Sequence, residues 1–259
     1  MRWLAIENGV VIPMQADRRL IENGHVLIDG ERIAAVGPGP APERPGLRRL
    51  DAAGGLVLPG FVDTHAHAGH ALTKSLGATA SEWMRIAGRI YAGATDGAFW
   101  HAEARLSALE RLRCGTTTAA LLMGGGPDVM MTHTPEAAEA HLEGVRAVGV
   151  AELLAVGPNR PAGPTAYTDW RGDTARVRHT SPAAQLDVTA ALIRASAGGL
   201  SRLAVSLPVF TAAELADESV ATLSRAAHRL ARDTGVLLVQ DGHRDGTLAA
   251  AAASVGLGG

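Results

Sequence analysis

Cysteine is nearly absent from this chain, because Cys114 is the only one among 259 residues. A single thiol can form neither an intrachain disulfide nor a zinc site built from cysteines. Aromatic residues make up only 3% of the chain, whereas 47% of the residues are hydrophobic. This composition excludes collagen-like, disulfide-stapled and disordered proteins, and it leaves a globular protein with a core of Ala, Leu and Val.

Neither sign of charge dominates, since 24 basic residues face 26 acidic ones for a formal net charge of -2. No strong field is available to attract nucleic acid or anionic lipid, so we expect neither as a partner. Long apolar runs are also missing. The most apolar stretches, at 115–126 and 246–259, fall short of the ~18 to 20 residues that a membrane-spanning helix needs. Glu7 and Asn8 interrupt the first apolar run, which argues against a signal peptide and predicts a cytoplasmic protein.

The first part of the chain carries two runs of alternating apolar residues, at 3–12 and 24–37. Asn-Gly and Asp-Gly pairs punctuate them and favour tight hairpin turns, so the runs predict a small antiparallel β unit. A loop rich in Pro, Gly and Arg follows at 38–50, in which Arg48 and Arg49 are interpreted as solvated charges. A second domain is expected to begin near Leu58, which gives predicted domains 1–57 and 58–259.

Beyond this boundary, apolar strands alternate with helical stretches. The patterns predict helices at 98–112, 135–148, 181–197 and 212–234, and strands at 116–122, 150–156, 203–207 and 236–239. The apolar run at 56–62 adds a first strand, and the alanine run at the end of the sequence adds a last helix. Such alternation is typical of parallel βαβ units, and about five of them are present.

The segment Asp63-Thr64-His65-Ala66-His67 ends the first of these strands. Alternate residues of a strand share one face, so His65 and His67 project to the same side and can hold one divalent cation. In barrels of parallel strands, catalytic groups lie at this end of the strand. A two-histidine pattern also arises by chance or caps a loop, so the neighbouring sequence has to decide between the two interpretations.

That neighbouring sequence resembles the amidohydrolase superfamily. The segment LVLPGFVDTHAH at 56–67 is similar to the signature that leads into the family's HxH ligand pair, and IDGERIAAVGPG at 28–39 is similar to a strand of its small sandwich. The resemblance extends over roughly residues 1–240 and is most specific over 25–67. It implies an α/β fold: an incomplete (β/α)8 TIM-type barrel of about five βα units with a small N-terminal β-sandwich portion.

Within the family, HALTKSLGATASEWMRI at 70–86 resembles the deaminase and chlorohydrolase branch, in which a long first loop carries a Glu-Trp pair like Glu82-Trp83. The Gly-Thr-Thr at Gly115 to Thr117 is similar to the start of that branch's second strand. This branch predicts a hydrolase that attacks a C–N (non-peptide) or C–Cl bond of a nitrogenous ring or amine through metal-activated water. In the predicted first loop, His70 and Trp83 are candidate substrate-binding residues, although a solvated position is an equal alternative for His70.

The resemblance also implies one divalent metal, Zn or Fe. Two-metal members carry a bridging lysine on the fourth strand, but 200–210 contains none, and Lys74 is the only lysine in the chain. The family's third ligand is a histidine after strand five. Here His243 is the candidate, although it fits only with a shift of two or three residues. Direct alignment instead places Gln240 or Asp241 there, and no glutamate follows for proton transfer.

Five βα units are fewer than a closed barrel requires. A fragment of a longer chain, a split gene product, and a homo-oligomer that completes the ring by domain swapping are the alternatives. A catalytically incomplete homologue that serves as a binding or assembly subunit is the second functional hypothesis, and a dihydroorotase-like or imidazolonase-like ring opener is the third. Surface or capping positions are expected for His101, His133, His141, His179 and His228.

Overall fold

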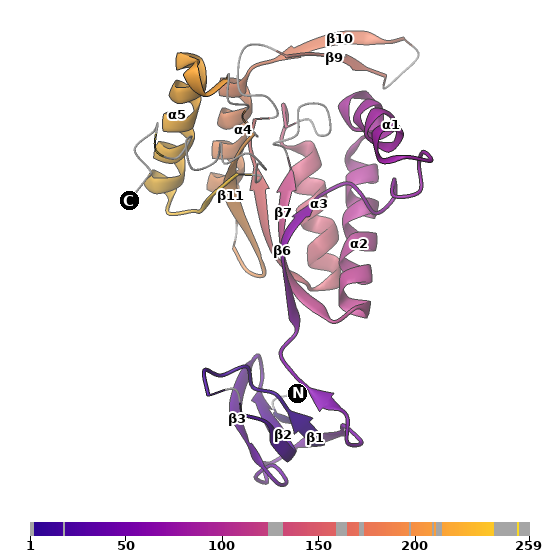
Figure 1. Ribbon diagram of the computed structural model, residues 1–259, viewed down its shortest axis with the longest axis vertical. Coiled ribbons are helices and arrows are strands. Elements are labelled where there is room, and N and C mark those ends of the chain that lie inside the picture. Colours follow the sequence, from indigo (N-terminus) through magenta and orange to yellow (C-terminus); the bar gives the residue numbers. More distant parts are fainter. Residues whose placement is uncertain are drawn as a thin grey trace. The chain divides into compact units, whose positions relative to one another are not determined.

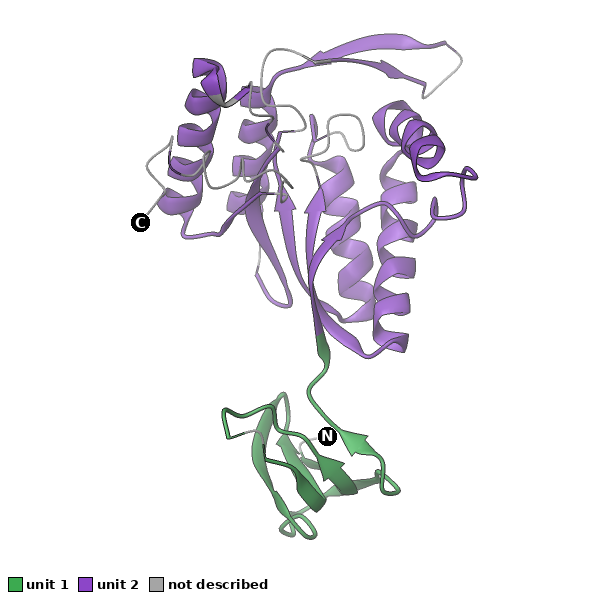
Figure 2. Cartoon of the chain, viewed as in Figure 1, with its two compact units in different colours: residues 1–61 green, residues 62–259 purple. Residues whose placement is uncertain are grey.

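The computed structural model describes residues 3–17, 19–123, 132–158, 165–170, 174–196, 198–208, 210, 214–240 and 253. The chain divides into two compact units, residues 1–61 and 62–259, coloured separately in Figure 2. Within the described part, no helix is long and apolar enough to cross a membrane. Of the predicted helix in the terminal alanine run, only Ala253 is among the described residues, and it is helical.

The first unit is a five-stranded sheet (Figure 1). Strands β1 (Trp3–Val11), β2 (Ile21–Asp29) and β3 (Arg32–Pro38) pair antiparallel in chain order, as the alternating runs predict. Strands β4 (Arg48–Asp51) and β5 (Leu56–Val57) both pair parallel to β1. Ala5, Leu27 and Ala41 form its small buried core.

Only one of the predicted turn signals forms a hairpin turn. Gly30, at φ 62°, lies between β2 and β3 and supplies the positive φ that such a turn requires. The two Asn-Gly pairs instead lie inside β1 and β2, where Asn8 and Asn23 have φ of 57° and 46°. The register between these strands shifts at both places, so the pairs mark irregular pairing within the strands.

The interpretation of Arg48 and Arg49 as loop charges is wrong. Both lie in β4, and the Arg49 guanidinium donates to Glu7 Oε1 at 2.5 Å and also to Glu43. The Arg49 hydrogen bond and the backbone N–H of Ala41 hold the pKa of the Glu7 carboxyl below its usual range. A polar contact of this kind between distant segments has no local sequence signal.

The second unit is built around a sheet in the order β12-β11-β8-β7-β6. Its strands are β6 (Phe61–His67), β7 (Thr116–Met123), β8 (Ala151–Val156), β11 (Ser201–Leu207) and β12 (Leu238–Gln240), and the pairs β7–β8, β8–β11 and β11–β12 are parallel. Its helices are α1 (Ala80–Gly93), α2 (Gly97–Arg113), α3 (Glu136–Val148), α4 (Pro182–Ala195) and α5 (Glu218–Thr234). Strand order follows chain order, which confirms the incomplete TIM-type barrel.

The two faces of this sheet differ. On one face, Leu121, Leu154 and Leu203 lie in a core cluster with residues of α1, α2, α3 and α4, and a second cluster packs α5 against β11. On the other face, Leu122, Ala155 and Ala204 form a separate cluster. Helices therefore cover the outer face of a half-barrel (Figure 1), and the second face is its inner wall.

The helix ends follow familiar capping rules. Asp96 and Ser181 accept hydrogen bonds from backbone N–H groups in the first turns of α2 and α4. Gly149 and Gly235 end α3 and α5 at φ of 87° and 69°, the left-handed conformation that favours glycine. The helix predicted from 212 begins only at Glu218, after a 3₁₀ turn at Glu214–Ala216.

Two elements depart from the expected organisation. The segment expected to be a long first loop contains α1, so Glu82 and Trp83 lie on a helix. Thr79 accepts from Glu82 N–H, and the Glu82 carboxylate accepts from Ala78 N–H, which is a capping pattern visible in the sequence as Thr-x-x-Glu. The hairpin of β9 (Thr165–Asp169) and β10 (Arg176–Thr180) was also not predicted.

Candidate metal centre

The histidine pair lies at the end of β6. His65 is exposed and His67 is partly buried, and their ring centroids are 5.2 Å apart at an interplanar angle of 83°. A strand brings residues i and i+2 to one face, so the backbone fixes the separation of the two imidazoles. The structure therefore brings together the two histidines that the sequence pairs.

The side chains of His65 and His67 lie on the inner face of the half-barrel. Ala66 packs against the core cluster on the helix-covered face, and Ala68, whose N–H donates to Leu122 O at 3.0 Å, belongs to the same cluster. Because alternate residues point to opposite faces, His65 and His67 point away from the helices. Both imidazoles are thus presented at the open end of the inner wall, where barrel enzymes gather their reactive groups.

His70 and Trp83 form a wall beside the pair. The His70 ring stacks on His67, with centroids 5.6 Å apart, and it meets the edge of Trp83 at 4.8 Å. Its Nδ1 lies 3.3 Å from the Tyr91 hydroxyl. Burial, with a further contribution from neighbouring His67, lowers the pKa of His70 to about 4. His70 and Trp83, the two residues predicted to bind substrate, are therefore in contact with each other.

An open pocket of about 390 Å³ adjoins this wall. His70 and Trp83 line it together with Lys74 and the start of α1. An aromatic surface with a few polar groups is typical of small-molecule sites. The position of the pocket makes it the candidate site for the part of a ligand that extends beyond the histidine pair.

A third metal ligand is not present among the described residues, because no group of three or more His, Cys, Asp or Glu side chains converges there. His243 lies outside the described residues. Gln240, which direct alignment placed at the ligand position, ends β12, and its side-chain amide donates to Pro208 O at 2.8 Å.

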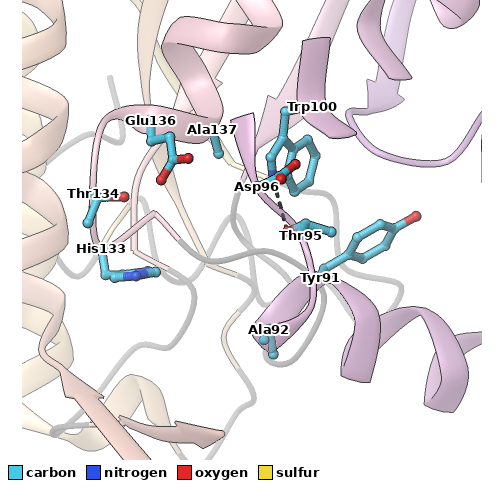
Figure 3. A pocket seen from close by; sticks show the side chains of 10 residues that line it. Tyr91, Ala92, Thr95, Asp96, Trp100, His133, Thr134, Glu136 and Ala137 are labelled. Atoms are coloured by element: carbon cyan, nitrogen blue, oxygen red, sulfur yellow. Dashed lines mark hydrogen bonds between the residues drawn. The ribbon is translucent and has the colours of Figure 1, made fainter. Parts of the chain in front are cut away.

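A second, much smaller cavity of about 20 Å³ lies between the end of α1 and the beginnings of α2 and α3 (Figure 3). This volume holds about one water molecule. Its acidic residues support the backbone, since Asp96 caps α2 and Glu136 Oε1 accepts from Gly97 N–H at 3.0 Å. Trp100 Nε1 donates to Thr95 Oγ1 at 3.1 Å on the same wall. The polar side chains of this cavity therefore stabilise the helix ends, and we do not assign a ligand to it.

The expectation of a surface or capping position is wrong for His141. Its side chain is buried, and its Nε2 lies 3.1 Å from Glu152 Oε1 and 3.2 Å from Oε2. The helix pattern places His141 next to buried Leu142, but only the packing of α3 on β8 shows which side faces inward. The pair lies on the helix-covered face, away from the histidine pair of β6.

A parallel half-barrel with two histidines at the end of its first strand defines the class of this protein as an incomplete TIM-type barrel. The model of the Amidohydrolase family matches residues 56–248. That match covers well over half of the chain, so the protein belongs to the Amidohydrolase family.

Individual relatives fit this assignment. A 5-methylthioadenosine/S-adenosylhomocysteine deaminase from Symbiobacterium thermophilum is 33% identical over 170 residues, which cover 64% of this chain and 36% of the deaminase. An imidazolonepropionase from Salinispora arenicola is 40% identical over 117 residues, covering 40% of this chain and 28% of that enzyme. The matched region thus spans only 36% and 28% of the length of these two curated relatives.

Solved structures agree on the fold. Atrazine chlorohydrolase from Arthrobacter aurescens TC1, complexed with zinc, aligns with a TM-score of 0.67 at 21% identity, covering 96% of this chain and 55% of that one. Guanine deaminase from E. coli aligns with a TM-score of 0.60 at 19% identity, covering 98% and 56%. At these identities the likeness establishes the shared architecture alone.

Proposed function

We propose that this protein is, or is part of, a metal-dependent hydrolase that cleaves a C–N (non-peptide) or C–Cl bond of a nitrogenous ring or amine. The observation that carries the proposal is the placement of His65 and His67 on the inner wall at the end of β6. The matched family and the deaminases among its relatives support the same reaction class.

The donor set fits one divalent cation, zinc or iron. Imidazole suits both metals, and two imidazoles fixed by one strand supply two of the three protein ligands of a catalytic zinc site. We assign the third position to His243, which follows β12 by three residues in the sequence. The cation, when bound, is a Lewis acid that lowers the pKa of water to roughly 7.

The remaining side chains bind and orient the substrate. His70 and Trp83 present an aromatic wall next to the ligand pair, and a planar nitrogenous ring packs well against such a surface. The 390 Å³ pocket beyond them accepts the substituent of that ring. Because 5-methylthioadenosine contains both parts, it is the first substrate to test.

Zinc binding tests the site directly. Metal-free protein is titrated with zinc chloride in a calorimeter, and we expect one zinc per chain. His65→Ala and His67→Ala should each weaken binding at least about tenfold, because each removes a ligand. His179→Ala, a change of an exposed histidine on β10, is the matched control and should leave affinity unchanged. Equal binding by all four proteins would contradict the assignment.

Turnover separates the two functional candidates. The specific observation that favours a catalytically incomplete homologue is Gln240, which direct alignment places at the family's third-ligand position and whose side-chain amide donates to Pro208 O. The hydrolase proposal is supported if the zinc-loaded chain releases ammonia from 5-methylthioadenosine and His65→Ala abolishes that release. Zinc binding without turnover of any amine, chloro compound or imidazolone in a screen supports the binding subunit.

A further inference from the structure

Glu103, in the second turn of α2, is a buried carboxylate with an unusual set of partners. Glu103 is only 1% exposed. Its Oε1 accepts from Ala71 N–H at 2.9 Å, and its Oε2 accepts from Leu72 N–H at 2.7 Å. Among the described residues no cationic side chain pairs with it. Burying a charge without a counterion is costly, and two charge-assisted hydrogen bonds to the backbone offset only part of that cost.

A second acidic residue of α2 reaches the same stretch of chain. Glu110 follows Glu103 by seven residues, two turns of the helix, so both lie on one face. Glu110 forms an ion pair with Lys74. We call residues 69–74 the rim segment. Helix α2 therefore contacts the rim segment at two points, through the buried Glu103 and through the exposed Glu110. The exposed pair contributes little, because solvent screens it and the long side chains lose freedom.

The rim segment carries the substrate wall of the candidate site. His70 belongs to it, and Trp83 Nε1 donates to Thr73 O at 2.7 Å. The Tyr91 hydroxyl donates to Gly69 O and also bonds Thr73. By contrast, His65 and His67 lie on β6, which the sheet holds independently of this segment.

We propose that Glu103 is a positioning residue that holds the rim segment and thereby sets His70 and Trp83 against the substrate. This inference rests on the proposed function. Glu103 acts through the backbone of Ala71 and Leu72 and does not touch the ligand pair. Its loss therefore weakens substrate binding while the metal ligands keep their places.

Hydrogen exchange of the intact chain, followed by mass spectrometry, tests the anchoring. Glu103→Gln leaves one acceptor oxygen and places an NH₂ group against the other N–H. We expect exchange in peptides covering 69–76 to rise about 10- to 100-fold, the range expected for a lost hydrogen bond to a charged group. Exchange in α3 should not change. Glu110→Gln is the matched control on the same helix, and it should leave the rim segment within about twofold.

Zinc affinity and steady-state kinetics with 5-methylthioadenosine test the positioning role. In Glu103→Gln we expect unchanged zinc affinity and a KM raised about tenfold or more with a smaller change in kcat. Glu103→Asp keeps the charge but is one methylene shorter, so it should behave in the same way.

Uniformly faster exchange throughout residues 62–259, an unchanged rim segment, or loss of zinc affinity in Glu103→Gln would each overturn the proposal. If the parent chain binds no zinc and turns over no substrate, the proposed function fails. The exchange measurement then still decides whether Glu103 anchors the rim segment.

Discussion

His141 on α3 and Glu152 on β8 form a buried pair, with Nε2 and Oε1 3.1 Å apart and side chains only 1% and 3% exposed. The pair joins a helix to the strand that follows it, on the face of the sheet that the helices cover. A buried polar group without a partner is costly, so the two residues depend on each other.

Removing one member of this pair should destabilise the second unit strongly. His141→Ala leaves the Glu152 carboxylate buried without its partner and opens a cavity. We expect the free energy of unfolding to fall by about 3 kcal/mol, measured by urea denaturation. His179→Ala, on the surface of β10, should change it by less than about 0.5 kcal/mol. Similar losses in both variants would show that the pair contributes nothing specific.

Gly93, the last residue of α1, is the point where this helix meets the β9–β10 hairpin. A Cβ atom at Gly93 would lie 1.8 Å from Thr168 O, and Gly93 O accepts from Trp170 N–H at 2.5 Å. Gly93→Ala should therefore separate the hairpin from α1 and cost about 1 to 3 kcal/mol. Hydrogen exchange measures this separation: relative to the parent chain, Gly93→Ala should speed exchange in β9 more than in β8.

Gly97→Ala provides the matched control for that substitution. Gly97 is the first residue of α2, and a Cβ there would meet Glu136 Oε1 at 3.4 Å, an ordinary contact. Since alanine favours a helix over glycine, stability should be unchanged or rise by up to about 1 kcal/mol. Destabilisation by both substitutions would contradict the assignment of a specific contact to Gly93.

Tyr91 should resist ionisation in the folded protein, because burial raises the pKa of its hydroxyl to about 12. At pH 11 the tyrosinate absorbance lost on Tyr91→Phe should be about 10% of one tyrosine in the folded chain and about 90% in urea. The raised pKa contributes stability that is full below about pH 10 and disappears as the pH rises through 12. Equal signals in the two states would refute the prediction.

Glu7 should make the first unit sensitive to acid. Its carboxyl accepts from Arg49 and from Ala41 N–H, and its pKa is lowered from the model-compound value of 4.5. A lowered pKa contributes stability above the unfolded value, and this contribution is lost as the pH falls through the folded value. Between about pH 5 and 3, the parent should lose more resistance to urea than Glu7→Gln.

Glu22→Gln is the control for that experiment, because Glu22 is an exposed residue of β2 in the same sheet. It should keep the acid sensitivity of the parent. If Glu7→Gln also keeps it, the contact between Glu7 and Arg49 does not govern the acid response.

Local sequence patterns predict most of the helices and strands of the second unit. The strand predicted at 116–122 is observed at 116–123, and the helix predicted at 135–148 is observed at 136–148. Periodicity and capping residues act within a few positions, so a single sequence records them. Helix α1 is the exception: the resemblance implies a loop there, whereas the Thr-x-x-Glu pattern of Thr79 and Glu82 is the local signal that indicates the start of a helix.

The sequence by itself determined the family, the order of the βα units and the pairing of His65 with His67, because strand geometry alone places residues i and i+2 on one face. Only the tertiary structure decided that Glu103 holds the rim segment, that His141 is buried against Glu152, and that Arg49 contacts Glu7. These contacts join residues 11 to 42 positions apart. Their partners are chosen by packing between elements, and no periodicity along the chain encodes that choice.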